Sequence, residues 1–284
     1  MKRESHTADE LALSYGRIPS QGMPLLYLHG VTRGLHDYVS LVPVFTPQWD
    51  VYALDFRGHG DSGRVHEDRY RVINYVQDAV TLVRDVIGRP TVIYGHSLGA
   101  MVAAAAAAEL PDLVHGIVME DPPFDTMGKR IAGTPFLTHF KAMREWAASD
   151  LSVAEITRQF QDMRLPTMDM QDTVRVGDVR DAASLRFSAK CLAKLDHNVL
   201  TPIVEGRWLE GYNVNSIMPQ VRCPAMLLQA DYDCGGMLPD EDARKVAAMI
   251  PDCIHIKVPN VGHLIHWMER DVTLRHTLNF TGSL

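Results

Sequence analysis

Gly95-His96-Ser97-Leu98-Gly99 is the stretch that decides the fold of this 284-residue chain, because it joins an apolar run to a helix-forming run. Residues 91–94 (TVIY) precede it, and residues 100–103 (AMVA) follow it. This order predicts a strand, a sharp turn and a helix, with Ser97 on the turn. Such a turn requires small neighbours, which Gly95 and Gly99 provide. Ser97 is therefore a candidate nucleophile, and the N–H groups that begin the helix would face negative charge developing beside it.

The composition is typical of a soluble globular enzyme, with 46% hydrophobic and 22% charged residues. The formal net charge of -7 argues against a nucleic acid or an acidic membrane as partner, because both are attracted by basic surfaces. We find no signal-peptide core at the N-terminus and no apolar run near the roughly 18 residues of a membrane span. The four cysteines lack metal-site or disulfide spacing. We expect a cytoplasmic protein, and the sequence says nothing about its oligomeric state.

Short apolar runs alternate with helical stretches, a pattern typical of a mostly parallel sheet flanked by helices. The strand candidates are residues 24–28, 51–54, 91–94, 116–119, 225–229 and 255–258. The stretch 122–222 lacks a clear strand of this sheet, and Ser152 with Glu155 has the capping-box pattern of a helix start. The sequence thus predicts an α/β core from residues 1–121 and 223–284. It also predicts an inserted helical cap, residues 122–222, over the carboxyl ends of the strands.

Two further strand ends carry residues that could act beside Ser97. After the first candidate strand, Gly30 permits a tight turn in which the Val31 N–H can point toward Ser97. Together with the Leu98 N–H, it would form a two-donor oxyanion hole. After the last candidate strand comes His263, a residue type that can take a proton from a serine hydroxyl.

These motifs together resemble the α/β-hydrolase superfamily. His29-Gly30, the loop at residues 57–62 (RGHGDS), the pentapeptide around Ser97 and Gly262-His263 stand in the order of that family. The resemblance implies an α/β-hydrolase fold and a catalytic triad with Ser97 as nucleophile and His263 as general base and acid. It implies Val31 and Leu98 as oxyanion donors. Neither a metal nor another cofactor is expected, because the sequence shows no ligand spacing for one.

The acid of the triad has two candidates. In most relatives it follows the strand that corresponds to residues 225–229, where this chain has Asp233, but the usual glycine of that turn is replaced by Ala230. Some members, including certain serine lactonases, carry the acid after the preceding strand, where this chain has Asp121. Either residue could instead stabilise its own strand end or turn. The two are close, with Asp121 slightly preferred, and Asp231 and Glu120 come third.

The expected activity is that of a serine esterase or lactonase, which cleaves a small-molecule ester or lactone through an acyl-enzyme. An alternative is hydrolysis of a C–C bond, because the same triad serves that reaction. A second alternative, from a different class, is a receptor-like protein that binds a ligand with little turnover, since a fold alone does not fix function.

Overall fold

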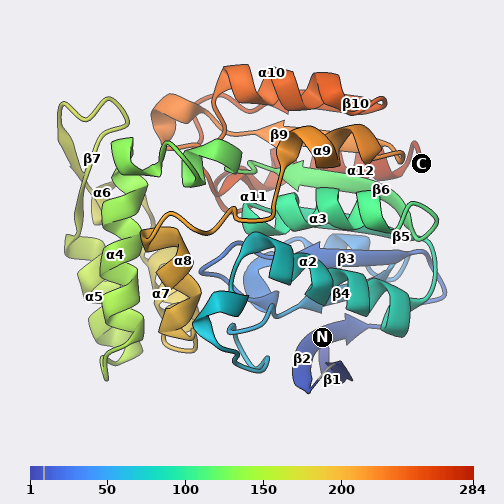
Figure 1. Ribbon diagram of the computed structural model, residues 1–284, viewed down its shortest axis with the longest axis horizontal. Helices are drawn as coiled ribbons and strands as arrows, with labels where there is room; N and C mark the ends of the chain where they lie inside the picture. The colour runs from blue at the N-terminus through green and yellow to red at the C-terminus, as the bar shows by residue number, and fades with distance from the viewer. Residues whose placement is uncertain (9) are drawn as a thin grey trace.

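The computed structural model describes residues 1–8 and 10–284 (Figure 1). Its centre is an eight-stranded sheet with the order β1-β2-β4-β3-β5-β6-β9-β10. The first two strands form an antiparallel hairpin that pairs antiparallel with β4, and every other neighbouring pair is parallel. The strands are β1 (Lys2–Ala8), β2 (Leu11–Ile18), β3 (Pro24–Leu28), β4 (Asp50–Leu54), β5 (Thr91–His96), β6 (Val114–Glu120), β9 (Ala225–Gln229) and β10 (Cys253–Lys257).

Each of the six strand candidates coincides with a strand of this sheet, to within two residues at either end. The runs were recognisable because β3, β4, β5 and β9 are buried along their whole length, so they need apolar residues on both faces. The N-terminal hairpin was not predicted. Its outer strand, β1, is an edge strand of mostly polar residues and carries no apolar run.

Helices cover both faces of the sheet, which divides the core into two apolar layers. One face packs against α2 (Val72–Thr81) with its π-helical continuation η3 (Leu82–Ile87), α3 (Leu98–Glu109) and α10 (Asp240–Met249). The other face packs against α1 (Val42–Phe45), α11 (Ile265–Met268) and α12 (Arg270–Thr281). Three short 3-10 turns lie in the core loops: η1 (Leu35–Tyr38), η2 (Glu67–Arg69) and η8 (Tyr232–Cys234).

Residues 122–222, here called the inserted segment, leave the sheet after β6 and return before β9. Figure 1 shows most of its helices grouped beyond the end of the sheet toward which β6 points, while residues 214–220 run beside α3. Its elements are η4 (Phe124–Met127), η5 (Ile131–Gly133), α4 (Pro135–Ala147), α5 (Val153–Asp162), β7 (Arg164–Pro166), β8 (Thr173–Arg175), α6 (Val176–Val179), α7 (Ala182–Leu192), η6 (His197–Leu200), α8 (Thr201–Val204), α9 (Val214–Ile217) and η7 (Met218–Gln220).

The inserted segment is mostly helical, and it also contains the small antiparallel pair β7–β8. The predicted capping box is present: Ser152 Oγ accepts from the Glu155 N–H, and the Glu155 carboxylate accepts from the Ser152 N–H at 2.8 Å. The segment is tied to the core where the Tyr212 hydroxyl donates to the Met101 carbonyl at 2.9 Å. Among the described residues, no helix has the length and apolar character needed to cross a membrane.

Candidate active site

Ser97 lies on a strained turn between β5 and α3. Its backbone angles, φ 55° and ψ -116°, are in a region that residues with a side chain rarely adopt. The turn is so tight that a Cβ atom on Gly95 would collide with the Gly99 carbonyl, and one on Gly99 would collide with the Leu28 carbonyl. The two glycines are therefore required by close packing. Ser97 therefore lies on a tight turn between the end of β5 and the start of α3, at the strand-turn-helix junction that the sequence predicted.

The turn after β3 packs directly against this serine. A Cβ atom on Gly30 would lie 3.3 Å from Ser97 Cβ, and the turn is closed by the Arg33 N–H, which donates to the Gly30 carbonyl at 3.0 Å. Val31 is the next residue in that turn, and Leu98 begins α3. Neither amide donates to another group of the described residues. Both N–H groups are thus free to receive an oxyanion beside Ser97.

His263 and Asp121 are brought together. His263 Nδ1 lies 2.6 Å from Asp121 Oδ2, and the carboxylate is fully buried while the imidazole is 16% exposed. Asp121 follows β6 in a left-handed conformation, with φ 44°. Its carboxylate also accepts from the backbone N–H groups of Ala230 at 3.2 Å and Met237 at 2.8 Å. Three donors therefore fix this carboxylate against the ring of His263.

The other acid candidates are used elsewhere. Asp233 is exposed, and its N–H donates to the Asp231 carboxylate at 3.3 Å within η8. The other oxygen of Asp231 accepts from the Asn260 N–H at 3.1 Å, which joins the loops after β9 and β10. Glu120 pairs with His266 rather than with His263, as described below. Among the described residues, His263 contacts no carboxylate other than Asp121 within ion-pair distance.

His96 links the serine turn to the histidine loop. Its Nε2 donates to the His263 carbonyl at 2.9 Å, and the two imidazole rings lie 4.5 Å apart between their centres. Burial, together with His263 and His266 nearby, holds the pKa of His96 well below its usual value. His96 is therefore neutral, with Nδ1 buried and without a hydrogen-bond partner among the described groups. It positions the loop of His263 beside Ser97.

A buried network of charges lies next to these residues. His266 Nδ1 is 2.8 Å from Glu120 Oε1, and its Nε2 is 3.4 Å from Asp37 Oδ2. Burial opposes charge on His266, but Glu120 and Asp37 outweigh it and raise the pKa of His266 to about 9. In the same way burial opposes charge on Glu120 and Asp37, yet His266 lowers the pKa of Glu120, and Arg33 and His266 lower that of Asp37.

A metal ion could in principle use three of these groups, since ligand atoms of His96, Glu120 and His266 lie within 4.8 Å of one another. However, the Glu120 carboxylate already accepts from His266 and from the Tyr94 hydroxyl at 2.5 Å. The His96 ring is committed through Nε2 to the His263 carbonyl. We therefore interpret the cluster as a hydrogen-bonded charge network that supports the site.

The match to a family model decides the classification. The model described as "alpha/beta hydrolase fold" matches residues 23–269. The chain belongs to the α/β-hydrolase family. This confirms the resemblance inferred from the motifs and the fold class that the strand pattern predicted, and it makes hydrolysis the general activity of the protein.

Three comparisons place this α/β hydrolase more closely. It is 30% identical over 282 residues to a 2-(acetamidomethylene)succinate hydrolase of Mesorhizobium japonicum, covering 93% of this chain and 90% of the relative. It is 24% identical over 267 residues to an N-formylmaleamate deformylase of Pseudomonas putida, covering 93% and 91%. The crystal structure of an E-2-(acetamidomethylene)succinate hydrolase superposes with a TM-score of 0.74 at 20% identity, over 99% of this chain and 100% of that one.

Sequence reasoning missed two side chains of the charge network, Arg33 and Asp37. Arg33 donates to Asp37 from Nε at 2.9 Å, and both side chains are buried. A signal was present, because opposite charges four residues apart directly follow the Gly30–Val31 turn. His266 and Trp267 lie on the short helix α11, which directly precedes the last helix.

Proposed function

We propose that this α/β hydrolase is a serine hydrolase with Ser97, His263 and Asp121 as its catalytic triad. The observation that carries the proposal is the 2.6 Å contact between His263 Nδ1 and the buried Asp121 carboxylate, on a loop that His96 ties to the strained serine turn. A carboxylate on Nδ1 selects the tautomer whose Nε2 is free to accept a proton. Asp121 is therefore the proposed acid, and Asp233 is left with its own turn.

The reaction follows from these groups. His263 Nε2 takes the Ser97 proton as Oγ attacks a carbonyl carbon, and the imidazolium that forms is stabilised by Asp121. The oxyanion accepts from the N–H groups of Val31 and Leu98, where loss of one donor typically costs about 3 kcal/mol. His263 then gives its proton to the leaving group. Water, activated by the same histidine, releases the acyl group from Ser97.

An ester or lactone is the substrate class we propose first, because an oxygen leaving group needs only the proton that His263 carries. The names of the two relatives favour a second candidate. One hydrolyses a succinate with an acetamidomethylene group, and the other is a deformylase. The triad could accordingly cleave an acyl group from carbon, as in the C–C bond hydrolysis considered above, or from nitrogen.

The test has two parts. A fluorophosphonate probe should label the wild-type protein and the control Ser149→Ala, in which an exposed serine of the inserted segment is removed, but not Ser97→Ala. A panel of substrates with the same acyl group is then compared by kcat/KM. The panel contains an ester, a lactone, an amide and a compound in which the acyl group is bound to carbon. Labelling that persists in Ser97→Ala contradicts the serine mechanism. The absence of both labelling and turnover would instead support a ligand-binding receptor.

A further inference from the structure

Arg180 is a cation of the inserted segment without a carboxylate partner among the described residues. Its Nη2 donates to Ser184 Oγ at 2.8 Å and to Ser188 Oγ at 3.1 Å, both on α7. The neighbouring carboxylate of Asp181 accepts from the Ser184 N–H at 2.8 Å and caps that helix. Burial, assisted by Arg33, lowers the pKa of Arg180 to about 10. The guanidinium is still charged at neutral pH.

The buried Asp37 carboxylate of the charge network is already paired with other cations. Asp37 Oδ1 accepts from Arg33 Nε at 2.9 Å and from Trp267 Nε1 at 2.7 Å, and Oδ2 faces His266. Asp37 and Glu120 thus oppose three cations, Arg33, His266 and Arg180. The Asp181 carboxylate also favours the charge on Arg180, but it is exposed and caps α7 rather than pairing with the guanidinium. Among the buried groups, three positive charges face two negative ones. A charge held away from water without a counter-ion is costly, so an anion bound there would be strongly favoured.

This excess charge lies at the boundary between the inserted segment and the catalytic residues. Ser188 Oγ is shared, because Arg33 Nη1 also donates to it, at 2.6 Å. The Arg33 guanidinium lies over the rings of Phe187 and Trp267, 4.7 and 5.2 Å from their centres. Arg33 closes the turn that packs on Ser97, and Trp267 is four residues beyond His263.

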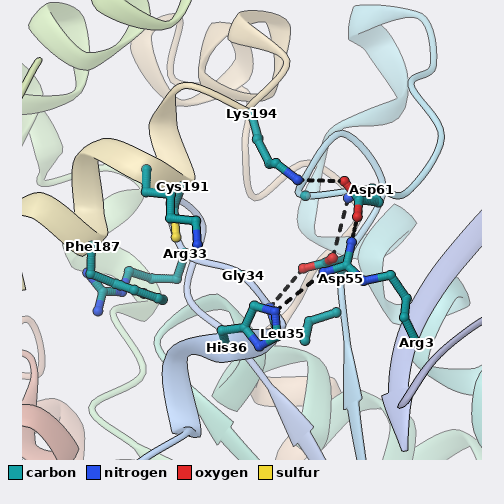
Figure 2. A pocket seen from close by; sticks show the side chains of 12 residues that line it. Arg3, Arg33, Gly34, Leu35, His36, Asp55, Asp61, Phe187, Cys191 and Lys194 are labelled. Carbon is teal, nitrogen blue, oxygen red and sulfur yellow. Dashed lines mark hydrogen bonds and ion pairs between the residues drawn. The ribbon is translucent and has the colours of Figure 1, made fainter. Parts of the chain in front are cut away.

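The space around this junction is open on one side. A cavity of about 300 Å³ lies between α7 and the loop after β3, with Arg33, Phe187 and Cys191 on its wall. Figure 2 shows Arg33 beside Phe187 and Cys191 of α7, on the side of the cavity away from Arg3 and Asp61. A small molecule in this cavity would contact Arg33. Arg180 is not on the cavity wall and adjoins Arg33 through the shared Ser188 hydroxyl.

We infer that Arg180, held in place by Ser184 and Ser188, binds a carboxylate group of the substrate while Ser97 attacks its carbonyl carbon. Only Nη2 of Arg180 is engaged with the two serines, so its other N–H groups can donate to both oxygens of a carboxylate. The Ser188 hydroxyl itself donates to the Ser184 carbonyl at 3.1 Å. The two relatives described above are named for acids of this kind, a succinate and a maleamate. The inference rests on the proposed serine mechanism and adds a substrate class to it.

The first measurement compares two substrates on the wild-type protein, mono-p-nitrophenyl succinate and its neutral methyl ester. The two differ only in the charge and methyl group of the distal carboxyl. The free acid should have a kcat/KM at least about 10-fold higher, as expected for a hydrogen bond between charged groups. The overall charge of -7 would repel this anion, so such a preference must come from a local cation.

The second measurement compares variants. Arg180→Gln should lower the ratio of the two kcat/KM values by about 10- to 100-fold, mostly through KM, and Arg180→Lys should restore part of it. The control Arg186→Gln removes an exposed arginine from α7, the helix that carries Ser184 and Ser188, and should leave the ratio unchanged. Succinate should inhibit hydrolysis of the neutral ester competitively in the wild-type protein and more weakly in Arg180→Gln.

The outcomes separate this inference from the proposed function. If the neutral ester is hydrolysed, and Ser97→Ala abolishes that activity, the serine mechanism holds. If the wild-type protein then hydrolyses the free acid and its methyl ester with equal kcat/KM, the carboxylate subsite is overturned. This outcome does not depend on whether Arg180→Gln folds. An unchanged ratio in a folded Arg180→Gln would also overturn it. If neither ester is hydrolysed and Ser97 is not labelled, the serine mechanism itself fails.

Discussion

Asp121 shows how much of the site depends on a single backbone conformation. The sequence placed two carboxylates at neighbouring strand ends, where either could reach the histidine loop. What distinguishes them is the direction of the N–H groups of Ala230 and Met237, which converge on Asp121. Ala230 and Met237 flank the turn that contains Asp233. The conformation of that turn directs their N–H groups toward Asp121, and no residue pattern specified this conformation. Sequence alone could therefore name Ser97 and His263, but could only rank the acids.

Replacing Asp121 with Asn tests that geometry. The amide is close in shape to the carboxylate, but its NH₂ group would face His263 Nδ1 or the backbone N–H groups and would stabilise the wrong imidazole tautomer. We expect kcat to fall by a factor on the order of 10⁴. The matched variant Asp233→Asn should change kcat by less than about 10-fold, because its carboxylate is exposed and stabilises only its own turn. The measurement is kcat of both variants on one activated ester. A larger loss in Asp233→Asn than in Asp121→Asn would assign the acid to Asp233.

At the scale of elements, the strands that the sequence revealed are those buried on both faces. The hairpin β1–β2 escaped because it lies at the sheet edge and pairs a polar strand with a half-buried one. Turn chemistry was more informative than periodicity in two places. Glycines fixed the junction of β5 and α3, and a serine with a glutamate fixed the start of α5. The pair β7–β8 has only three residues in each strand, which is too short for an alternating pattern to be recognised in the sequence.

The junction of β5 and α3 predicts a large and local effect on stability. Gly99→Ala would push a methyl group into the Leu28 carbonyl of the neighbouring strand, so β3 or α3 must shift. We expect the free energy of unfolding to fall by about 1–3 kcal/mol or more. Gly133→Ala is the control, since no atom lies within 4 Å of the added carbon, and it should stay within about 0.5 kcal/mol of wild type. Urea denaturation of both variants measures this, and equal midpoints would refute the steric argument.

The inserted segment is proposed to act as a lid over the site. Replacing residues 135–192 (α4 to α7) with a flexible linker would keep the Tyr212 contact that holds the remainder of the segment to α3. We expect kcat/KM to fall much more for a bulky ester than for a short activated one, because the short ester needs mainly the triad. The ratio of the two rates is the measurement. Equal losses on both substrates would show that these helices belong to the core rather than to a lid.

For the whole molecule, the buried charges couple stability to pH. The pKa of His266 is raised from about 6.5 to about 9 in the folded protein by Glu120 and Asp37. A group whose pKa is raised by folding stabilises the protein fully below its unfolded pKa, and that contribution disappears as the pH rises through the folded pKa. The shift corresponds to roughly 3 kcal/mol. No residue pattern indicated these contacts, because Asp37 and Glu120 are 229 and 146 positions away from His266 along the chain.

We therefore expect the free energy of unfolding to decrease between pH 6.5 and 9, measured by urea denaturation at fixed ionic strength. Glu120→Gln removes the closer counter-charge of His266, so the decrease across this window should become smaller. The control His66→Asn changes an exposed histidine and should reproduce the wild-type curve. A wild-type curve that is flat or rises across this window would mean that His266 is neutral in the folded state.

The anchoring of Asp121 has a consequence for how such proteins can diverge. Its carboxylate takes backbone hydrogen bonds from the loop after β9, although the next residue along the chain already belongs to the inserted segment. The codons for residues 122–222 can therefore drift, or be exchanged as a block with those of another lineage, without displacing the carboxylate from His263. With Arg180 encoded in that block, a recombination event would transfer a preference for charged substrates and leave the reaction chemistry to the inherited core.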